Sequence, residues 1–539
     1  MAMSRQALQS AKLHTVLTLE VRGHRYRYSD AAFSIANTDT AQGGPLLAIA
    51  AGLEEPDIIE EVAASGAGLE PVGCSVTCGG EWAQVVAHVQ DATGELSQIA
   101  EGGDWANRRV LVAGRVSEPV YGASDETIDF SVGGDVLMDS GVLPQPQWIV
   151  DSTTWPRTAS AGVLTPDDCK NVWYNVMFGH PGQGLTTGRP AAACIVEIDS
   201  GTNDNSANPV IVLLAYGHIT CTSATLYNDS QVTNATVTPS WTTDNRGTPV
   251  TIVSVAVGTL AIASGDELWW RPLVGGGLWS LTGTGTMRSA GEVVQWILGY
   301  ATVPIDTTRT LSTIAQLQAY QLDFIISEPI GPVEMVTDQI LPLMPIALAW
   351  GPNGAYLAPI PWRAIAKDAL WQIDPAKNGG YRSSKITTRA WSELLTVLRL
   401  EYNVDLQENK YQSSITVAYD ADGSDPLYQP HPLMAETATR WPGVRSNVLS
   451  TDVICDNATA ALSLDYQAAV SSQIWEDVDV VLPQEYQAMK AGDVALVTLP
   501  DIDTWVARVC YVVSVPRIGG DIVASFRTLP NWIRDGGGP

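Results

Sequence analysis

A ribbon of two alternating strands joined by a polar turn is the feature that most limits how this chain can fold. Residues 400–420 read LEYNVDLQENKYQSSITVAYD. Successive side chains of a strand point to opposite faces of a sheet. The apolar sets of the two strands are Leu398, Leu400, Tyr402 and Val404, and Tyr411, Ile415, Val417 and Tyr419. Because a shift of one residue would turn either set into water, the pattern predicts a hairpin with fixed register.

Strand patterns with the same period recur along most of the chain. One strand is expected over residues 13–28 and a strand pair over 108–122. Further strands are expected within 126–138, between 207 and 274, and in AGDVALVTLP, TWVARVCYVVSVPRI and DIVASFRTLP near the end. The 47 Gly and 32 Pro fit short turns between them. A chain of 539 residues is too long for one core. We predict a mainly β, multidomain protein of small β-barrels or sandwiches with a few short helices.

Changes in pattern divide the chain into regions. Residues 146–205 are rich in Pro, Thr and Gly, which fits a connector or an insertion packed on its neighbours. The expected regions are an N-terminal β domain at 1–145, this turn-rich segment at 146–205, a β domain at 206–285, a helix-containing α+β region at 286–395, a β-ribbon region at 396–460 and a C-terminal β-barrel at 461–539.

Short helices are expected in the α+β region and ahead of the last strands. The first begins at Ser289, which with Glu292 has the S-x-x-E spacing of a capping box. The second begins at Pro332, where proline loses no hydrogen bond, and ends before Pro342. The segment ATAALSLDYQAAVSSQIWEDVDVVLP is typical of a helix that runs into a strand.

The charge balance disfavours several classes of partner. The chain has 58 Asp and Glu against 30 Lys and Arg, a net charge of −28. This charge repels phosphate backbones and anionic membranes, so non-specific nucleic-acid binding and stable membrane docking are not expected. The start lacks the apolar core of a secretory signal, and no apolar run reaches the ~18–20 residues of a transmembrane helix. We expect synthesis in the cytoplasm and, if anything, a basic partner.

The cysteines offer one weak candidate for a metal site. Seven cysteines spread along the chain favour reduced, buried thiols over a disulfide framework. Cys74 and Cys78, in CSVTC, have a spacing found in half of a zinc or iron–sulfur site. The other half would need Cys169, Cys194 or His88 to lie close by. Buried thiols are the simpler interpretation, so no metal or other cofactor is expected.

Other motifs that are similar to known functional motifs are incomplete. GTGTMRSAG (283–291) has neither the glycine spacing of a dinucleotide turn nor the lysine of a P-loop. DADGSD (420–425) and DSGTNDN (199–205) lack the glycine and terminal glutamate of a calcium loop. His180 and His218 could act as an acid or base, but no G-x-S-x-G or H-E-x-x-H motif accompanies them. We therefore predict no catalytic residue.

Amphipathic aromatic residues are abundant. The chain has 18 Trp and 17 Tyr but only 5 Phe. Such residues are common at interfaces and on sugar-binding surfaces, although they also fill β cores. Trp269 and Trp270 are neighbours in an expected strand, so they point to opposite faces. One of them, like Trp279, is then available to cover a second layer, a partner or a ligand.

The order of several segments resembles a known family. They are NVWYNVMFGHPGQGLTTGRP, VIVLLAYGHITCTSATLYNDSQ, SAGEVVQWILGYATVPIDTTRTLSTIAQL, GPVEMVTDQILPLMPIALAWGPNGAYLAPIPW, LRLEYNVDLQENKYQSSITV and the closing strands AGDVALVTLP, WVARVCYVVSV and DIVASFRTL. From about residue 170 onward this order resembles the baseplate hub, or tail-tip, proteins of tailed bacteriophages and gene-transfer-agent-like particles. Residues 1–145 are compatible with the first barrel of that family.

The resemblance implies a structural, non-enzymatic protein. Hubs of this family form threefold rings of β-barrel domains that cap the tail tube and join the distal tail ring to fibres or a piercing device. For this chain we expect a homotrimer at the distal end of a virion tail. The implied partners are the distal tail protein, the tape-measure protein and tail fibres or other tail-tip proteins, with DNA only in passage through the channel.

Two alternatives remain. The first is a β-rich receptor- or glycan-binding tail adhesin, suggested by the tryptophans and the Thr-rich loops; an aromatic row on an exposed face would favour it. The second is a tail-associated enzyme that cleaves glycans or peptides. Two carboxylates facing each other in a cleft, or a bound metal, would favour the enzyme.

Overall fold

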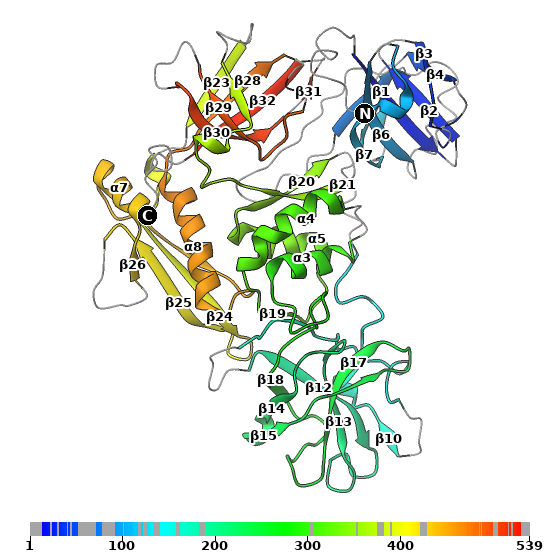
Figure 1. Ribbon diagram of the computed structural model, residues 1–539. Coiled ribbons are helices and arrows are strands. Elements are labelled where there is room, and N and C mark those ends of the chain that lie inside the picture. The colour runs from blue at the N-terminus through cyan, green and yellow to red at the C-terminus, as the bar shows by residue number, and fades with distance from the viewer. Residues whose placement is uncertain are drawn as a thin grey trace.

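The computed structural model is mainly β, with several sheets and a few helices, as predicted (Figure 1). It describes residues 13–529 apart from 22–23, 30–31, 40, 42, 44–45, 52–71, 78–91, 101, 117–119, 122–126, 133–140, 158–161, 183–188, 302–304, 352–353, 375–381, 389–390, 421–427, 484–485, 487, 500–504, 516 and 519–520. Figure 1 shows two β domains at the top, helices at the centre, another β domain at the bottom and a ribbon at the left.

The N-terminal β domain is built around β1 (Leu13–Val21), which pairs with β2 (His24–Ser29). The single strand predicted over residues 13–28 is therefore wrong, because this range forms an antiparallel pair in which Val21 lies opposite His24. Its six-stranded sheet has the order β3 (Phe33–Ala36), β4 (Leu46–Ala51), β2, β1, β6 (Thr93–Ala100) and β7 (Arg109–Arg115). A second sheet contains β5 (Val72–Thr77), β9 (Thr127–Val132) and β8 (Val120–Tyr121). Both faces of β1 are buried, because Leu17 and Leu19 enter one core while Val16 enters another.

The middle β domain carries an eight-stranded sheet. The order is β15 (Thr233–Val237), β14 (Ser223–Asn228), β18 (Leu268–Val274), β12 (Ala191–Asp199), β13 (Val210–Tyr216), β17 (Pro249–Val255) and β16 (Ser240–Thr243), and β10 (Val163–Leu164) pairs with β12. Nearby, β11 (Val176–Phe178) pairs with β19 (Phe324–Ile326). In β18, Trp270 is fully buried and Trp269 is half-buried, which confirms that they point to opposite faces.

Aromatic side chains join the middle β domain to the helices above it. Trp148 stacks on Tyr216 with ring centroids 3.6 Å apart, and Tyr300 meets the edge of Trp148 at 5.5 Å. Phe178 contacts Trp296 edge-on at 5.3 Å. Trp148 and Phe178 are buried. A good part of the aromatic content therefore fills a core between layers.

The helix predicted at Ser289 begins there but is capped differently. α3 (Ala290–Leu298) follows the N-cap Ser289, whose side chain makes no capping hydrogen bond. The predicted capping box is therefore wrong, because Glu292 Oε1 accepts from Ser280 Oγ at 2.8 Å instead. α4 (Thr307–Gln316) follows α3. Short 3-10 turns lie at Trp105–Asn107, Asp167–Cys169, Asp229–Gln231, Leu317–Ala319, Ala366–Asp368 and Trp391–Glu393.

The helix predicted from Pro332 runs past its predicted end. It opens as α5 (Pro332–Glu334), widens into a π-helical segment (Met335–Ile340) and tightens into a 3-10 turn (Leu341–Leu343). Pro342 lies in the first positions of that turn, where no backbone N–H is needed. The proline therefore changes the type of helix without ending it.

A central hairpin is buried on both faces. It consists of β20 (Ile346–Gly351) and β21 (Gly354–Pro359). On one face, Leu348 and Leu357 pack in the core that contains the helices. The other face carries small residues and one tyrosine, namely Ala347, Ala349, Tyr356 and Ala358. These pack with Tyr511 of the C-terminal β domain, while β7 of the N-terminal domain also contacts the hairpin.

A bulky side chain on the small-residue face of this hairpin should destabilise the protein. Ala349 is fully buried against the C-terminal β domain. We expect Ala349→Phe to cost about 1–3 kcal/mol, because extra volume in a packed core forces strain. Urea unfolding followed by tryptophan fluorescence measures it. The exposed Ala366 is the matched control; equal effects of Ala349→Phe and Ala366→Phe would contradict the double-sided packing.

The predicted ribbon forms as expected. β24 (Val397–Asp405) pairs with β25 (Lys410–Ala418), and Leu398 lies opposite Val417 and Leu400 opposite Ile415. β27 (Ser446–Ser450) and β26 (Tyr428–Pro430) extend the sheet at its two edges. α7 (Pro432–Arg440) and α8 (Asn457–Ser472) accompany it, and α8 contacts β24 and β25. Tyr411 is exposed, so the predicted apolar set of the second strand is buried only in part.

The C-terminal β domain forms a seven-stranded sheet. Its order is β22 (Trp371–Ile373), β29 (Val494–Val497), β30 (Arg508–Ser514), β32 (Asp521–Thr528), β28 (Glu476–Leu482) and β23 (Arg382–Thr388), with β31 (Arg517–Ile518) beside β32. In β30, Cys510 and Val512 enter one core while Val509 and Tyr511 face the central hairpin. The predicted helix that runs into a strand is α8 followed by β28.

Candidate functional surfaces

Two of the candidate motifs meet at one buried carboxylate. Arg288, in the segment 283–291, makes a paired contact with Asp323, with Nε to Oδ1 at 2.6 Å and Nη2 to Oδ2 at 2.8 Å. The backbone N–H of His180 donates to Asp323 Oδ1 at 2.8 Å, and His180 Nδ1 lies 2.9 Å from Gly275 O. The Asp323 side chain is fully buried. We name this arrangement of His180, Arg288 and Asp323 the Asp323 junction.

The Asp323 junction is suited to holding segments together. Burial opposes the charge of Arg288, but the hydrogen bonds and negative charge of Asp323 outweigh it and raise the pKa of Arg288. The thiol of Cys455 donates to Asp323 O at 3.2 Å. Gly179 has φ +60°, and a Cβ there would meet Asp323 Oδ1 at 2.2 Å, so the close approach requires glycine. The segment 283–291 therefore supplies Arg288 to a structural ion pair with Asp323.

A second junction ties the tip of the ribbon to the middle β domain. Arg189 Nη1 donates to Gln407 Oε1 at 2.8 Å, and its Nη2 pairs with Asp229 Oδ1 at 2.7 Å. Gln407 Nε2 in turn donates to Asp229. The guanidinium of Arg189 lies 4.7 Å from the ring centroid of Tyr227. Burial raises the pKa of Asp229, and the charge of Arg189 opposes this. The polar turn at the end of the ribbon is thus an anchor between domains.

An exposed aromatic cluster lies on the middle β domain. His218, the second candidate histidine, is exposed and stacks on Trp241 with centroids 5.0 Å apart and planes 9° apart. Trp241 and Trp279 meet edge-to-face at 6.2 Å, and they are 52% and 38% exposed. The sequence singled out His218 and Trp279 but missed Trp241. A lone tryptophan in SWTT, between polar neighbours, was the available signal. We name these three residues the aromatic cluster.

The candidate ion-binding loops show turn geometry. In DSGTNDN, Asp199 Oδ1 accepts from the backbone N–H of Gly201 at 2.7 Å and of Thr202 at 3.3 Å. Asp204 and Asn205 border an open hollow of about 560 Å³. Within the described residues, no group of three or more His, Cys, Asp and Glu side chains is placed to hold a metal. Of DADGSD, residues 421–425 lie outside the described residues.

The weak metal candidates lie largely outside the described residues. Cys74 belongs to β5, but its side chain is not described, and Cys78 and His88 lie outside the described residues. The five cysteines with described side chains are buried, and none of them forms a disulfide: Cys169, Cys194, Cys221, Cys455 and Cys510. Cys194 Sγ lies 3.6 Å from Cys169 O, so these two residues do meet. Among the described helices, none is long and apolar enough to cross a membrane.

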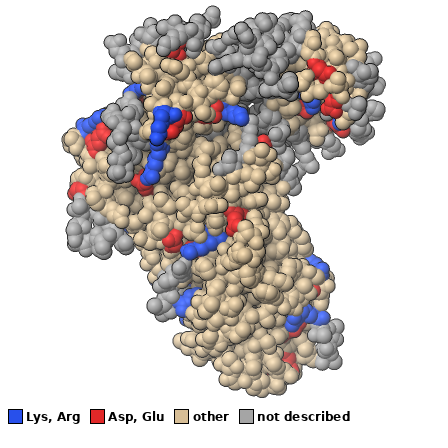
Figure 2. Space-filling model, viewed as in Figure 1, with Lys and Arg blue, Asp and Glu red and all other residues tan. Residues whose placement is uncertain are grey.

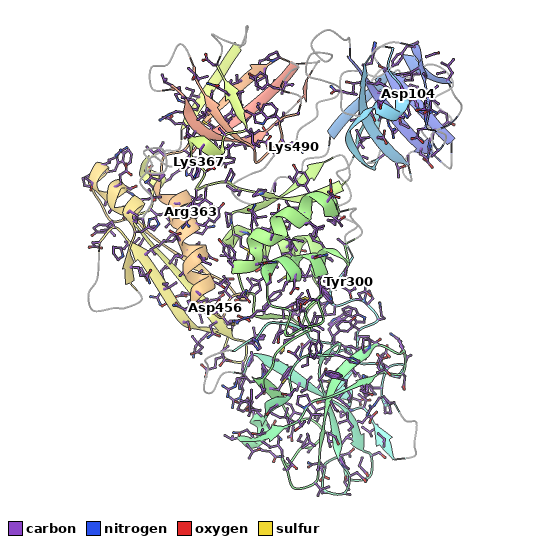
Figure 3. All side chains as sticks on the ribbon, viewed as in Figure 1. Asp104, Tyr300, Arg363, Lys367, Asp456 and Lys490 are labelled. Carbon is purple, nitrogen blue, oxygen red and sulfur yellow. The ribbon has the colours of Figure 1, made fainter. Side chains whose placement is uncertain are left out.

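One face of the molecule carries little charge over its described residues. Figure 2 shows mostly uncharged residues on the viewed face. Figure 3 labels Arg363, Lys367 and Lys490 below the C-terminal β domain. Arg363 pairs with Asp465 and lies 4.3 Å from the ring centroid of Trp362. An uncharged face is the kind that a neighbouring subunit can cover without desolvating charges.

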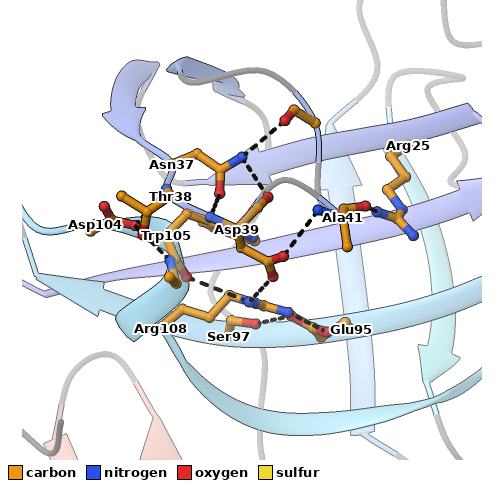
Figure 4. Close-up of polar contacts among 12 residues, drawn as sticks. Arg25, Asn37, Thr38, Asp39, Ala41, Glu95, Ser97, Asp104, Trp105 and Arg108 are labelled. Atoms are coloured by element: carbon orange, nitrogen blue, oxygen red, sulfur yellow. Dashed lines mark hydrogen bonds and ion pairs between the residues drawn. The ribbon is translucent and has the colours of Figure 1, made fainter.

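A polar network holds a loop of the N-terminal β domain (Figure 4). Asp104 Oδ1 accepts from Thr38 N at 3.0 Å and from Ala106 N at 2.9 Å. Arg108 Nε donates to Glu95 Oε1 at 2.6 Å and lies 5.0 Å from the ring centroid of Trp105. Burial opposes ionisation of Glu95, but hydrogen bonds from Arg108 and Ser97 outweigh it and lower the pKa of Glu95.

The lowered pKa of Glu95 predicts a dependence of stability on acid. Because the folded pKa lies below the unfolded one of about 4.3, Glu95 stabilises the protein above that pH and loses this effect as pH falls through the folded pKa. We expect Glu95→Gln to be destabilising at pH 7 and to flatten the acid limb of stability. Thermal unfolding between pH 3 and pH 7 measures it. A Glu95→Gln profile parallel to that of the wild type would contradict the prediction.

Comparison with known proteins gives only distant likenesses. No protein-family model and no curated protein matches the sequence. Among solved structures, a tail protein from Neisseria meningitidis MC58 is 9% identical with a TM-score of 0.33, covering 96% of this chain and 97% of that one. A 43 kDa tail protein of prophage MuSo2 from Shewanella oneidensis is 8% identical with a TM-score of 0.33, covering 96% and 97%.

A further likeness is to a chain of a native gene transfer agent virion. It is 11% identical with a TM-score of 0.35, covering 74% of this chain and 93% of that one. All three TM-scores are below 0.5.

Proposed function

We propose that the chain is a structural, non-enzymatic component of a bacteriophage or gene-transfer-agent-like tail, and that it acts there as the hub at the distal end. The observation that carries this proposal is the central hairpin, which is buried on both faces and contacts both upper β domains. Such a hairpin holds two β domains at fixed positions. Rigidly held β domains are what a ring-forming subunit needs at its interfaces.

The sequence resemblance supplies the symmetry of the proposed ring. Family hubs are threefold, so three copies of this chain would place the two upper β domains of each copy around a common axis. A closed ring also covers sheet edges, which in a free chain invite unwanted pairing. The uncharged surface in Figure 2 suits such covering. We therefore propose a homotrimer in the virion, assembled after synthesis in the host cytoplasm.

The proposed partners follow from that position. They are the distal tail protein, the tape-measure protein and tail fibres or other tail-tip proteins, and DNA would only pass through. A net charge of −28 would keep the genome from adhering to the channel wall. No cofactor is part of the proposal. A neutral or basic channel in the assembled ring would contradict the role given to the charge.

The location and the symmetry can be tested separately. We expect antibodies against the chain to label tailed particles only at the end opposite the head, as seen by negative-stain electron microscopy. We expect the purified chain to have three times its 57.6 kDa chain mass in light scattering. Label along fibres would contradict the hub. A monomer that stays monomeric when mixed with the distal tail protein would contradict the ring.

A second function is favoured by one observation. The aromatic cluster is a group of exposed rings, and exposed aromatic rings favour a glycan-binding tail adhesin. A hub and a glycan-binding surface are compatible on one chain, because the cluster lies on the middle β domain and the central hairpin holds the other two.

A further inference from the structure

The aromatic cluster is held rigidly by its own surroundings. Trp241 lies on the edge strand β16, and its Nε1 donates to Ile219 O at 3.0 Å. The loop that carries His218 and Ile219 is fixed by the buried Thr251, whose hydroxyl donates to Gly217 O at 2.8 Å and accepts from Ile219 N at 3.2 Å. The exposed rings therefore lose little conformational freedom when a ligand binds.

The rings also form a corner. The planes of Trp241 and Trp279 are 82° apart, so together they offer two walls, with His218 stacked on Trp241. The face of an aromatic ring carries partial negative charge and attracts polarised C–H groups. The C–H faces of a pyranose ring are such groups. A corner of two indoles therefore fits a sugar ring better than it fits a flat protein surface.

A row of hydroxyl groups follows Trp279 directly in the sequence. Ser280 Oγ donates to Glu292 Oε1 at 2.8 Å. Each hydroxyl has one proton, and Ser280 has already given its proton to Glu292. Thr282 must therefore donate to Ser280 at 2.8 Å, and Thr284 must in turn donate to Thr282 at 3.0 Å. The direction of the row is therefore fixed by Glu292. The exposed oxygens of Thr282 and Thr284 keep lone pairs that accept hydrogen bonds from ligand hydroxyls.

We propose that the aromatic cluster and the hydroxyl row of Ser280, Thr282 and Thr284 form a binding site for a neutral, pyranose-containing glycan. The sugar stacks on the indoles and donates hydroxyl protons to the threonine oxygens. Neutral sugars are selected because the row presents acceptors and ends at the negative charge of Glu292, which disfavours uronic or sialic acids. This site rests on the second proposed function, glycan binding at the aromatic cluster, and not on the hub assignment.

The test uses the full chain on an array of purified bacterial surface polysaccharides and peptidoglycan fragments, both neutral and anionic. We expect binding to neutral glycans, followed by calorimetry with the strongest binder. Trp241→Ala and Trp279→Ala should each weaken affinity roughly tenfold or more, because each loses a stacking wall. Thr284→Val, which keeps the shape but removes the hydroxyl, should also weaken binding, and Thr284→Ser should retain it.

The control is Tyr411→Ala, because Tyr411 is similarly exposed at 36% but lies on the ribbon. It should leave affinity unchanged. Thermal unfolding and light scattering of every variant separate loss of binding from loss of fold or assembly. The proposal is overturned if the wild type binds no glycan of the array or only anionic ones, or if the tryptophan variants bind equally well. It is also overturned if Trp241→Ala dissociates an oligomer, because the cluster is then a subunit interface.

Discussion

Replacement of Asp323 by alanine is expected to lower the free energy of unfolding by about 3–5 kcal/mol, because it leaves the Arg288 guanidinium without its buried partner. Asp323 is fully buried and accepts from Arg288 through both oxygens and from the backbone of His180. Without Asp323, the turn that carries His180, the segment that carries Arg288 and the strand β19 are no longer linked through one carboxylate. Urea unfolding of the full chain, followed by tryptophan fluorescence, measures the change.

Two further variants make this prediction specific. Asp167→Ala removes an exposed ion pair with Lys170 and should have little or no effect. The double replacement Asp323→Leu with Arg288→Met should be less destabilising than Asp323→Ala, because it removes the unpaired charge together with its partner. If the double variant is as unstable as the single one, an unpaired arginine is not the cause.

Replacement of Trp155 by alanine is expected to cost about 3–5 kcal/mol through the cavity that it leaves in the middle β domain. Trp155 is fully buried, and its Nε1 donates to Tyr174 Oη at 3.0 Å. Tyr174 Oη donates in turn to Asp244 Oδ2 at 2.8 Å, and burial raises the pKa of Tyr174. Without the indole N–H, the buried Tyr174 hydroxyl also loses a hydrogen-bond donor.

The matched variants separate volume from hydrogen bonding. Trp155→Phe keeps most of the ring and should lose less stability than Trp155→Ala. Trp241→Ala removes an indole that is 52% exposed and should change stability far less than Trp155→Ala. Thermal unfolding of these variants against the wild type gives the order. Equal losses for the buried and the exposed tryptophan would contradict the assignment of Trp155 to the core.

The prediction from sequence was strongest where local pattern and burial agree. The predicted hairpin forms from β24 and β25, and Leu400 and Ile415, one from each predicted apolar set, lie opposite each other. The strand β18 separates Trp269 from Trp270 as period two requires. The start of α3 at Ser289 was also correct. These features depend on neighbours within a few residues, which the sequence displays directly.

The candidate sites were predicted less well. The predicted capping box does not form, because Glu292 instead accepts a hydrogen bond from Ser280, twelve residues away. Arg288 and His180 belonged to separate motifs, and Asp323 was not a candidate at all, yet all three meet. The exposure of Trp241 depends on the position of β16 at the edge of its sheet, which the sequence does not show.

The sequence alone determined that this chain is a multidomain β protein and that it is strongly acidic. It also determined the positions of many strands from the alternation of apolar residues. Alternation, turn residues and charge are properties of neighbouring positions, so no tertiary contact is needed to see them. Only the tertiary structure decided that the central hairpin is buried on both faces, that Asp323 joins distant segments, and that Trp241, Trp279 and His218 share one exposed corner. Those features depend on contacts between residues far apart in the chain. Such contacts form, and stabilise the protein, only when the layers pack together.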